Sequence, residues 1–146
     1  DRPLDARGIG DARLVGKALA AKGVSPQNIL CSSSRRTRQT LEEILPVLPF
    51  PGHVHYSDSL YSADAECYLR EIRAFAHSPS LLVIGHNPSM EDLAIHLAPN
   101  DDRKAARLLM EGFPTGALAH FHAEGGLAHI KLHSCPLLDF LRPKDL

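Results

Sequence analysis

Two groups of side chains in this sequence could bind an anion or move a proton, and each follows an apolar run typical of a buried strand. The first is His86, which comes after the apolar residues 81–84 and Gly85. An imidazole titrates near neutral pH, and the carboxyl ends of strands are where open α/β sheets bind ligands. The alternative is a histidine that only caps or hydrogen-bonds the turn of Pro88 and Ser89, with Ser89 capping the next helix. The histidine alone does not decide between them.

The second group follows the short apolar run at residues 29–31, where three serines precede an arginine-rich segment at residues 35–40. Serine hydroxyls often cap helices, and the unpaired N–H groups of a helix N-terminus bind anions. Three arginines in the first turns of a helix oppose its dipole, and a bound anion would offset that cost. The alternative is a solvated basic face. The combination of hydroxyls, strand end and arginines favours an anion site.

The rest of the chain predicts the elements that would position these residues. Apolar spacing predicts helices over residues 8–22, from 35 until prolines 46, 49 and 51, over 63–76, from 90 to 97, and over 103–110. Apolar runs predict strands at 29–31, 54–56 and 81–84, and a hairpin of 117–123 with 127–132 around Gly125-Gly126. This alternation predicts a three-layer α/β/α sandwich with a mostly parallel sheet and an antiparallel edge hairpin.

Composition limits the class of protein. The chain has 146 residues, 44% of them hydrophobic, and a net charge of −1, which predicts one domain over residues 1–146. This charge balance gives no reason to expect a nucleic-acid or membrane partner, and no apolar run approaches the length of a membrane span. Three widely spaced cysteines fit free thiols in a reducing compartment, and no signal-peptide pattern is present. We therefore expect a cytoplasmic protein.

Two histidines raise the alternative of a metal-dependent protein. His122 and His129 would lie opposite each other in the predicted hairpin. No third ligand stands at a typical spacing, and the polar outer face of an edge hairpin is the simpler interpretation. The sequence therefore predicts no metal and no cofactor.

Together, the two strand-end motifs resemble those of the histidine phosphatase (phosphoglycerate mutase-like) superfamily, and most closely its SixA-type branch, the phosphohistidine phosphatases. The motifs are Ser32 followed by Arg36-Thr37-Arg38-Gln39-Thr40, and Gly85-His86-Asn87-Pro88. The likeness continues in order from residues 2–8 through Leu60-Tyr61 to residues 140–143. It implies a phosphate pocket in which Arg36 is the second phosphate-binding arginine and His86 the second histidine. Ser32 and Asn87 would add substrate contacts.

The resemblance also implies two pocket residues that this sequence does not contain. In the family they belong to an Arg-His-Gly motif at the end of the first strand, which carries the nucleophilic histidine. No Arg-His-Gly occurs here, and its expected place is before Asp1. We therefore expect the domain to be N-terminally incomplete, with its first strand missing from the sequence.

The resemblance implies a metal-independent phosphatase that works through a phosphohistidine intermediate. The neighbourhood of Leu60 offers no clear general acid besides Asp64, which fits a helix N-terminus better, and the interval 48–60 is too short for a lid. Both features suit a substrate with a good leaving group on an open surface, such as phosphohistidine of a protein. A small phosphorylated metabolite is an alternative substrate. A non-catalytic phosphate- or phosphoprotein-binding module that lacks the nucleophile is an alternative function.

Overall fold

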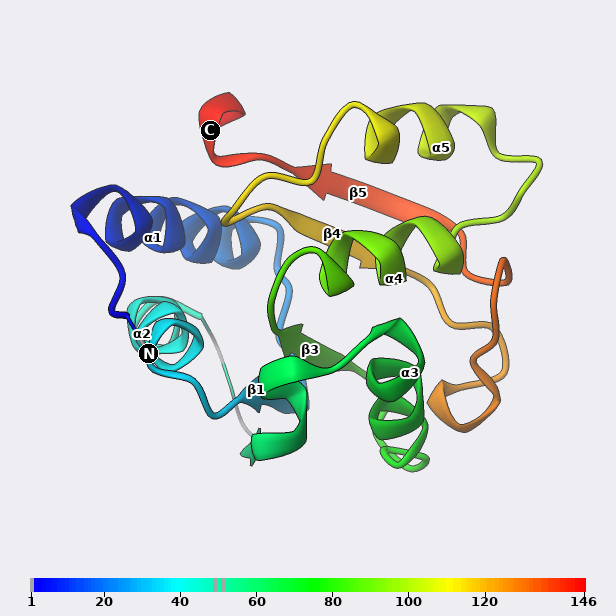
Figure 1. Cartoon of the computed structure of the whole chain (residues 1–146), viewed down its shortest axis with the longest axis horizontal. Helices are drawn as coiled ribbons and strands as arrows, with labels where there is room; N and C mark the ends of the chain where they lie inside the picture. The colour runs from blue at the N-terminus through cyan, green and yellow to red at the C-terminus, as the bar shows by residue number, and fades with distance from the viewer. Residues whose placement is uncertain (1, 49, 51) are drawn as a thin grey trace.

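The computed structural model describes residues 2–48, 50 and 52–146, in which helices and strands alternate (Figure 1). The helices are α1 (Ala6–Ala21), α2 (Arg35–Ile44), α3 (Ala65–Arg73), α4 (Ser89–Leu97) and α5 (Arg103–Met110). The strands are β1 (Asn28–Ser32), β2 (His53–Ser57), β3 (Leu81–Ile84), β4 (Leu118–Phe121) and β5 (Leu137–Leu141). The short 3₁₀ turns are η1 (Asp58–Ser62), η2 (Leu127–His129) and η3 (Pro143–Asp145).

The five predicted helices and the first three predicted strands are confirmed. Asp1 and two of the three prolines expected to close the second helix, Pro49 and Pro51, lie outside the described residues. Among the described residues, no helix combines the length and the apolar character that crossing a membrane requires.

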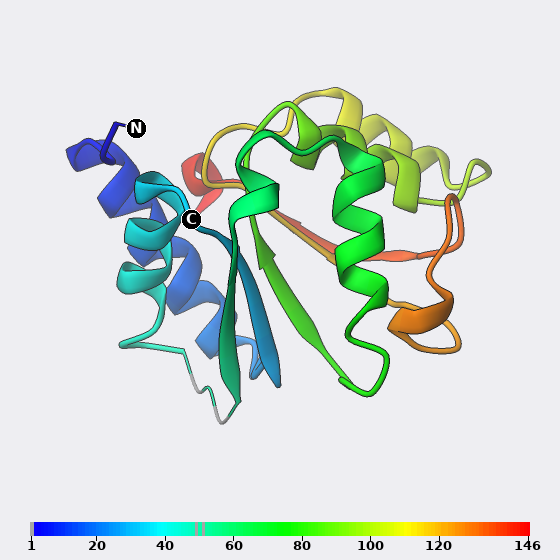
Figure 2. The same ribbon diagram turned by 60° about the horizontal axis from the view of Figure 1, so that its bottom comes forward.

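β1 is the central strand of a parallel sheet with the order β2-β1-β3. Its side chains alternate between two cores because successive residues of a strand point to opposite faces. Ile29 and Cys31 pack with apolar residues of α1 and α2, whereas Leu30 packs with residues of α3 and α4. Figure 2 shows α1 and α2 on one side of this sheet and α3 on the other. The predicted three-layer α/β/α architecture is therefore confirmed.

The antiparallel pair exists, but its second strand is not the predicted one. β4 pairs with β5, so that His120 lies opposite Asp139. Residues 125 and 126 do form a turn at positive φ, as their glycines predict, yet the following segment forms η2. Leu127 and Ile130 pack against the core that α3 helps to form, and this burial takes the segment away from β4. The predicted hairpin of 117–123 with 127–132 is therefore wrong, since packing outweighs the local turn signal.

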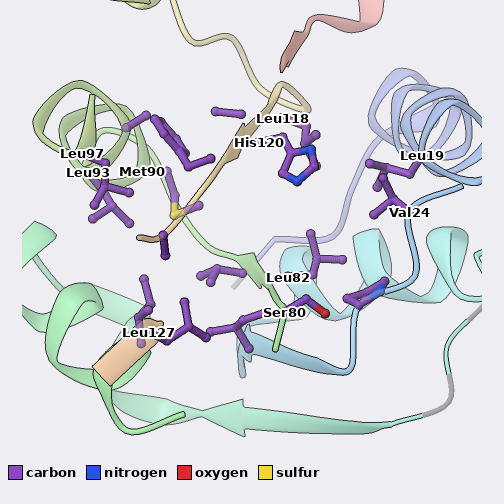
Figure 3. Close-up of a pocket in the computed structure, with 18 of the residues that line it drawn as sticks. Leu19, Val24, Ser80, Leu82, Met90, Leu93, Leu97, Leu118, His120 and Leu127 are labelled. Atoms are coloured by element: carbon purple, nitrogen blue, oxygen red, sulfur yellow. The ribbon is translucent and has the colours of Figure 1, made fainter. Parts of the chain in front are cut away.

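An apolar groove separates the two sheets. Within the described part of the chain, β3 pairs only with β1 and β4 pairs only with β5, so the edges that face the groove have no strand partner. Leu82 of β3, Leu118 of β4 and Met90 of α4 are among the apolar side chains that line it (Figure 3). The cavity has a volume of about 550 Å³. An ion pair between Lys22 and Asp139 links the end of α1 to β5.

Candidate functional site

The candidate site lies where β1 and β3 end. The two strands are parallel neighbours, with Cys31 opposite Ile84, so the residues that follow them meet at one edge of the sheet. Ser32 Oγ lies 2.8 Å from Nε2 of His86, although 54 residues separate them in the chain. The sheet thus brings together the two motifs that the sequence analysis selected.

A buried tyrosine holds the backbone at His86. The His86 N–H donates a hydrogen bond of 3.1 Å to the hydroxyl of Tyr68, which is fully buried in α3. Gly85 makes this approach possible, because a Cβ atom at residue 85 would lie 2.2 Å from the Tyr68 hydroxyl. The glycine before the histidine is therefore required by packing.

Two effects lower the pKa of His86. Burial lowers the pKa of His86 below its ordinary 6.5, and the positive charge of Arg36 lowers this pKa further. The two residues line the same cavity, which has a volume of about 280 Å³. An anion placed between them would oppose both effects, because it would favour the protonated imidazole.

Three buried hydroxyls fix the start of α2. Ser34 is the N-cap, and its Oγ accepts a hydrogen bond from the Thr37 N–H at 3.4 Å. The Thr37 hydroxyl donates to the carbonyl of Ser32 at 2.7 Å. Ser32, Ser34 and Thr37 are each at most 4% exposed. This network ties the end of β1 to the first turn of α2, and it therefore determines where Arg36 lies relative to His86.

The arginines at the start of α2 have different surroundings. Arg36 lines the cavity with His86. Arg38 instead donates from Nε to the Ser33 carbonyl at 2.8 Å, and its guanidinium lies 4.6 Å from the centre of the Tyr56 ring. The structure therefore places Arg36, and not Arg38, beside the histidine.

Three other residues that the sequence analysis named are Asn87, Ser89 and Asp64, and each forms a hydrogen bond within the protein. The Asn87 side-chain N–H donates to the Phe113 carbonyl at 2.9 Å, so that Asn87 braces the loop at the rim of the cavity.

The prediction that Ser89 caps the next helix is wrong. Pro88 is the N-cap of α4, and the Ser89 hydroxyl donates to the Ala63 carbonyl. Asp64 is the N-cap of α3, which leaves its carboxylate engaged with the Cys67 N–H, as the helix-terminus interpretation predicts.

The two histidines of the metal alternative do not lie opposite each other in the structure. His122 is not opposed to His129, because the latter lies in η2, and Nε2 of His122 is 3.4 Å from a carboxylate oxygen of Glu124. In the part of the chain that the structure describes, no group of three His, Cys, Asp or Glu side chains could hold a metal ion.

Sequence reasoning missed the roles of Tyr68 and of residues 113–118 in the site. Tyr68 has an apolar helix position, and its pattern predicts a core residue, which it also is. The loop 113–117 and Leu118 of β4 line the cavity from the part of the chain that follows α5. Only tertiary packing brings these residues to His86, so their spacing in the sequence does not predict a role in the site.

Comparison with known proteins identifies the family. The model of the histidine phosphatase superfamily (branch 1) matches residues 1–64. An uncharacterised protein of Mycobacterium tuberculosis is 35% identical over 99% of this chain and 90% of its own length. One of Mycobacterium leprae is 30% identical over 99% of this chain and 88% of its own length. The chain belongs to the histidine phosphatase superfamily.

Solved structures of SixA-type proteins share the fold. A provisionally assigned phosphohistidine phosphatase SixA of Agrobacterium tumefaciens is 29% identical, with a TM-score of 0.80 over 98% of this chain and 84% of that chain. Another, from Nakamurella multipartita, is 26% identical, with a TM-score of 0.87 over 98% and 86%. A protein histidine phosphatase SixA bound to tungstate is 24% identical, with a TM-score of 0.79 over 99% and 86%, a likeness of fold alone.

Proposed function

We propose that this protein is a metal-independent phosphatase that acts on phosphohistidine of a protein. Arg36 and His86 would bind the phosphoryl group. The observation that carries the proposal is the cavity at the ends of β1 and β3, which Arg36 and His86 line together. A forked guanidinium and a histidine N–H are donors suited to phosphoryl oxygens. Membership of a phosphatase superfamily and the SixA-like fold support the same conclusion.

The chemistry requires a nucleophile in addition to these residues. An imidazole nitrogen attacks phosphorus, the bond between phosphorus and the substrate imidazole breaks, and the departing imidazole takes up a proton. Water then attacks the phosphorylated enzyme histidine and releases phosphate. Burial and Arg36 lower the pKa of His86, and a bound phosphoryl group would raise it again, so a protonated His86 would add positive charge where the phosphoryl group needs it. Ser32 would hold His86 in place through the contact at 2.8 Å.

We place the nucleophile on a strand that precedes Asp1 and fills the groove between β3 and β4. Both edges that border the groove lack a strand partner within the described residues. Leu82, Val83 and Leu118 line both the groove and the cavity at His86, so a strand parallel to β3 would lead to that cavity. Leu4 also lines the cavity and donates its N–H to Gln39 Oε1 at 2.6 Å, so the first described residues lie beside the site.

One observation favours a second candidate function. The 146 residues contain no Arg-His-Gly motif, so this sequence by itself fits a module that binds phosphate or a phosphorylated protein without turnover. The residues before Asp1 distinguish the two candidates, because only the phosphatase needs a histidine there.

The test compares the chain with and without the residues that precede Asp1 in its gene. We expect the longer form to release phosphate from a histidine-phosphorylated protein in the presence of a chelator. Arg36→Ala should lower kcat/KM by on the order of 100-fold, the scale seen when one transition-state donor is removed. Arg13→Ala removes the same charge from α1, where Arg13 pairs with Glu43, and should leave turnover unchanged.

Two results would contradict the proposal. The first is wild-type turnover in both Arg36→Ala and His86→Ala. The second is no phosphate release by a longer form whose upstream residues include Arg-His-Gly. Phosphate binding by a longer form that lacks this motif would instead support the binding module.

A further inference from the structure

Tyr61 stands next to His86, and the proposed chemistry does not use it. The centres of the two rings are 5.9 Å apart, and their planes are tilted by 46°. Tyr61 is 49% exposed, so its ring is accessible from solvent. Tyr61 is not among the residues that line the cavity of Arg36 and His86, although its ring lies beside that of His86.

The turn that carries Tyr61 is held firmly. Leu60 is fully buried, and its carbonyl accepts a hydrogen bond of 3.5 Å from the Tyr68 hydroxyl. The hydroxyls of Ser57 and Ser59 donate to the two carboxylate oxygens of Glu71 on α3, at 2.6 and 2.9 Å. The ring of Tyr61 is therefore presented by a braced turn, which lowers the entropy cost of using it in binding.

We infer that Tyr61 is the surface against which the planar leaving group of the substrate packs. This inference rests on the proposed function. In an in-line displacement the leaving group departs on the side opposite the nucleophile, and we place the nucleophile in the groove. Tyr61 is not among the residues that line the cavity to which that groove leads, yet its ring lies beside His86 and is half exposed, so it can contact a group that leaves the cavity. A tyrosine ring attracts a flat aromatic or imidazole ring in a stacked or edge-to-face arrangement. Tyr61 would thus favour phosphorylated imidazole and aryl groups over aliphatic ones.

The test uses two phosphonates that cannot be hydrolysed and therefore needs no nucleophile. Phenylphosphonate carries a ring and methylphosphonate does not. We would titrate each into the form that includes the residues before Asp1 and follow binding by NMR, which also reports the state of the His86 ring. In the wild-type protein we expect phenylphosphonate to bind more tightly than methylphosphonate.

Three variants test whether the ring of Tyr61 causes the tighter binding of phenylphosphonate. Tyr61→Ala should weaken phenylphosphonate binding by about 2- to 12-fold and leave methylphosphonate binding unchanged, the range expected for one aromatic pair. Tyr61→Phe keeps the ring and should retain the preference. Tyr56→Ala is the matched control, since Tyr56 is 48% exposed and packs on Arg38 instead of His86. It should retain the preference as well.

The possible failures are separable. An unchanged preference in Tyr61→Ala, or equal weakening of both phosphonates, would overturn the inference, because equal weakening means that Tyr61 only supports His86. Wild-type affinity for both phosphonates in Arg36→Ala would overturn the proposed phosphate site. Failure of the wild-type protein to bind either phosphonate would overturn both the proposed phosphate site and the proposed role of Tyr61.

Discussion

His86 is held by contacts from two other elements, one to its side chain and one to its backbone. Ser32 at the end of β1 contacts Nε2, and Tyr68 of α3 accepts the N–H. Gly85 leaves room for the Tyr68 hydroxyl. The orientation of the imidazole therefore depends on a side chain at the end of β1 and on one in α3.

Replacing Tyr68 with phenylalanine tests the backbone contact. The variant leaves the His86 N–H without its acceptor, so we expect the free energy of unfolding to fall by about 1 kcal/mol. Phosphate binding should weaken too, because the backbone at His86 is freed. Urea denaturation and an NMR titration with phosphate measure the two effects. Tyr56→Phe at the exposed tyrosine of β2 is the control, and equal behaviour of the two variants would contradict the prediction.

The pKa of His86 should respond to phosphate. In the protein alone, burial and then Arg36 keep this pKa below 6.5. A bound phosphate places negative charge beside the imidazole and should raise the pKa. An NMR titration of the His86 ring between pH 4.5 and 8.5, with and without phosphate, measures the shift (the pH range is chosen to span roughly two units on either side of an ordinary histidine). A pKa that does not move on addition of phosphate would place the anion elsewhere.

At the scale of elements, the start of α2 connects stability to anion binding. The Ser34 cap and the Thr37 hydroxyl bond the helix to the end of β1. α3 has a comparable cap in Asp64, which accepts from Cys67. Both caps stabilise the N-terminus of their helix, but only the Ser34 cap lies in the turn that carries Arg36.

Alanine substitutions at the two caps should separate these roles. Ser34→Ala and Asp64→Ala should each lower the free energy of unfolding by about 1 kcal/mol, the usual cost of losing an N-cap. Only Ser34→Ala should weaken phosphate binding, since it loosens the turn that carries Arg36. Thermal denaturation and phosphate titration of both variants check this. Equal phosphate affinity in the two variants would show that the cap does not position Arg36.

The central strand also protects a thiol. Cys31 has no exposed surface, and burial raises the pKa of its thiol to about 11. At pH 8 we expect iodoacetamide to modify Cys67, which is partly exposed, well before Cys31. Mass spectrometry of the separated peptides gives the two rates. Equal rates in the folded protein would mean that β1 opens far more readily than its central position implies.

For the whole molecule, the half-buried His86 and the buried Cys31 should limit stability at opposite ends of the pH range. The pKa of His86 is lowered by folding, so the unfolded chain takes up this proton first and stability falls as the pH drops below about 6.5. The pKa of Cys31 is raised from 9.0 to about 11, so the unfolded chain loses this proton first and stability falls as the pH rises through that interval.

Urea denaturation from pH 5 to 10 should therefore show the greatest stability between roughly pH 7 and 8.5. His86→Gln removes the titrating imidazole and should flatten the acid side of the curve. An acid side that is as steep in His86→Gln as in the wild-type protein would assign the loss to other groups. Asp139 is not one of these groups, because its pKa is lowered from 3.8, chiefly by its hydrogen bond with Lys22, and its contribution is lost only at lower pH.

Local patterns in the sequence determined the helices, the three parallel strands and the placement of both motifs after strand ends. Those features depend on how apolar residues are spaced within short segments, and that spacing can be read from the sequence alone. The tertiary structure decided which strand pairs with β4, because Leu127 and Ile130 gain more from burial against α3 than from a hairpin. It also decided that Ser32 and Tyr68 hold His86 and that Tyr61 stands beside it. These contacts join residues far apart in the chain, and only the packing of α3 and the parallel sheet brings them together.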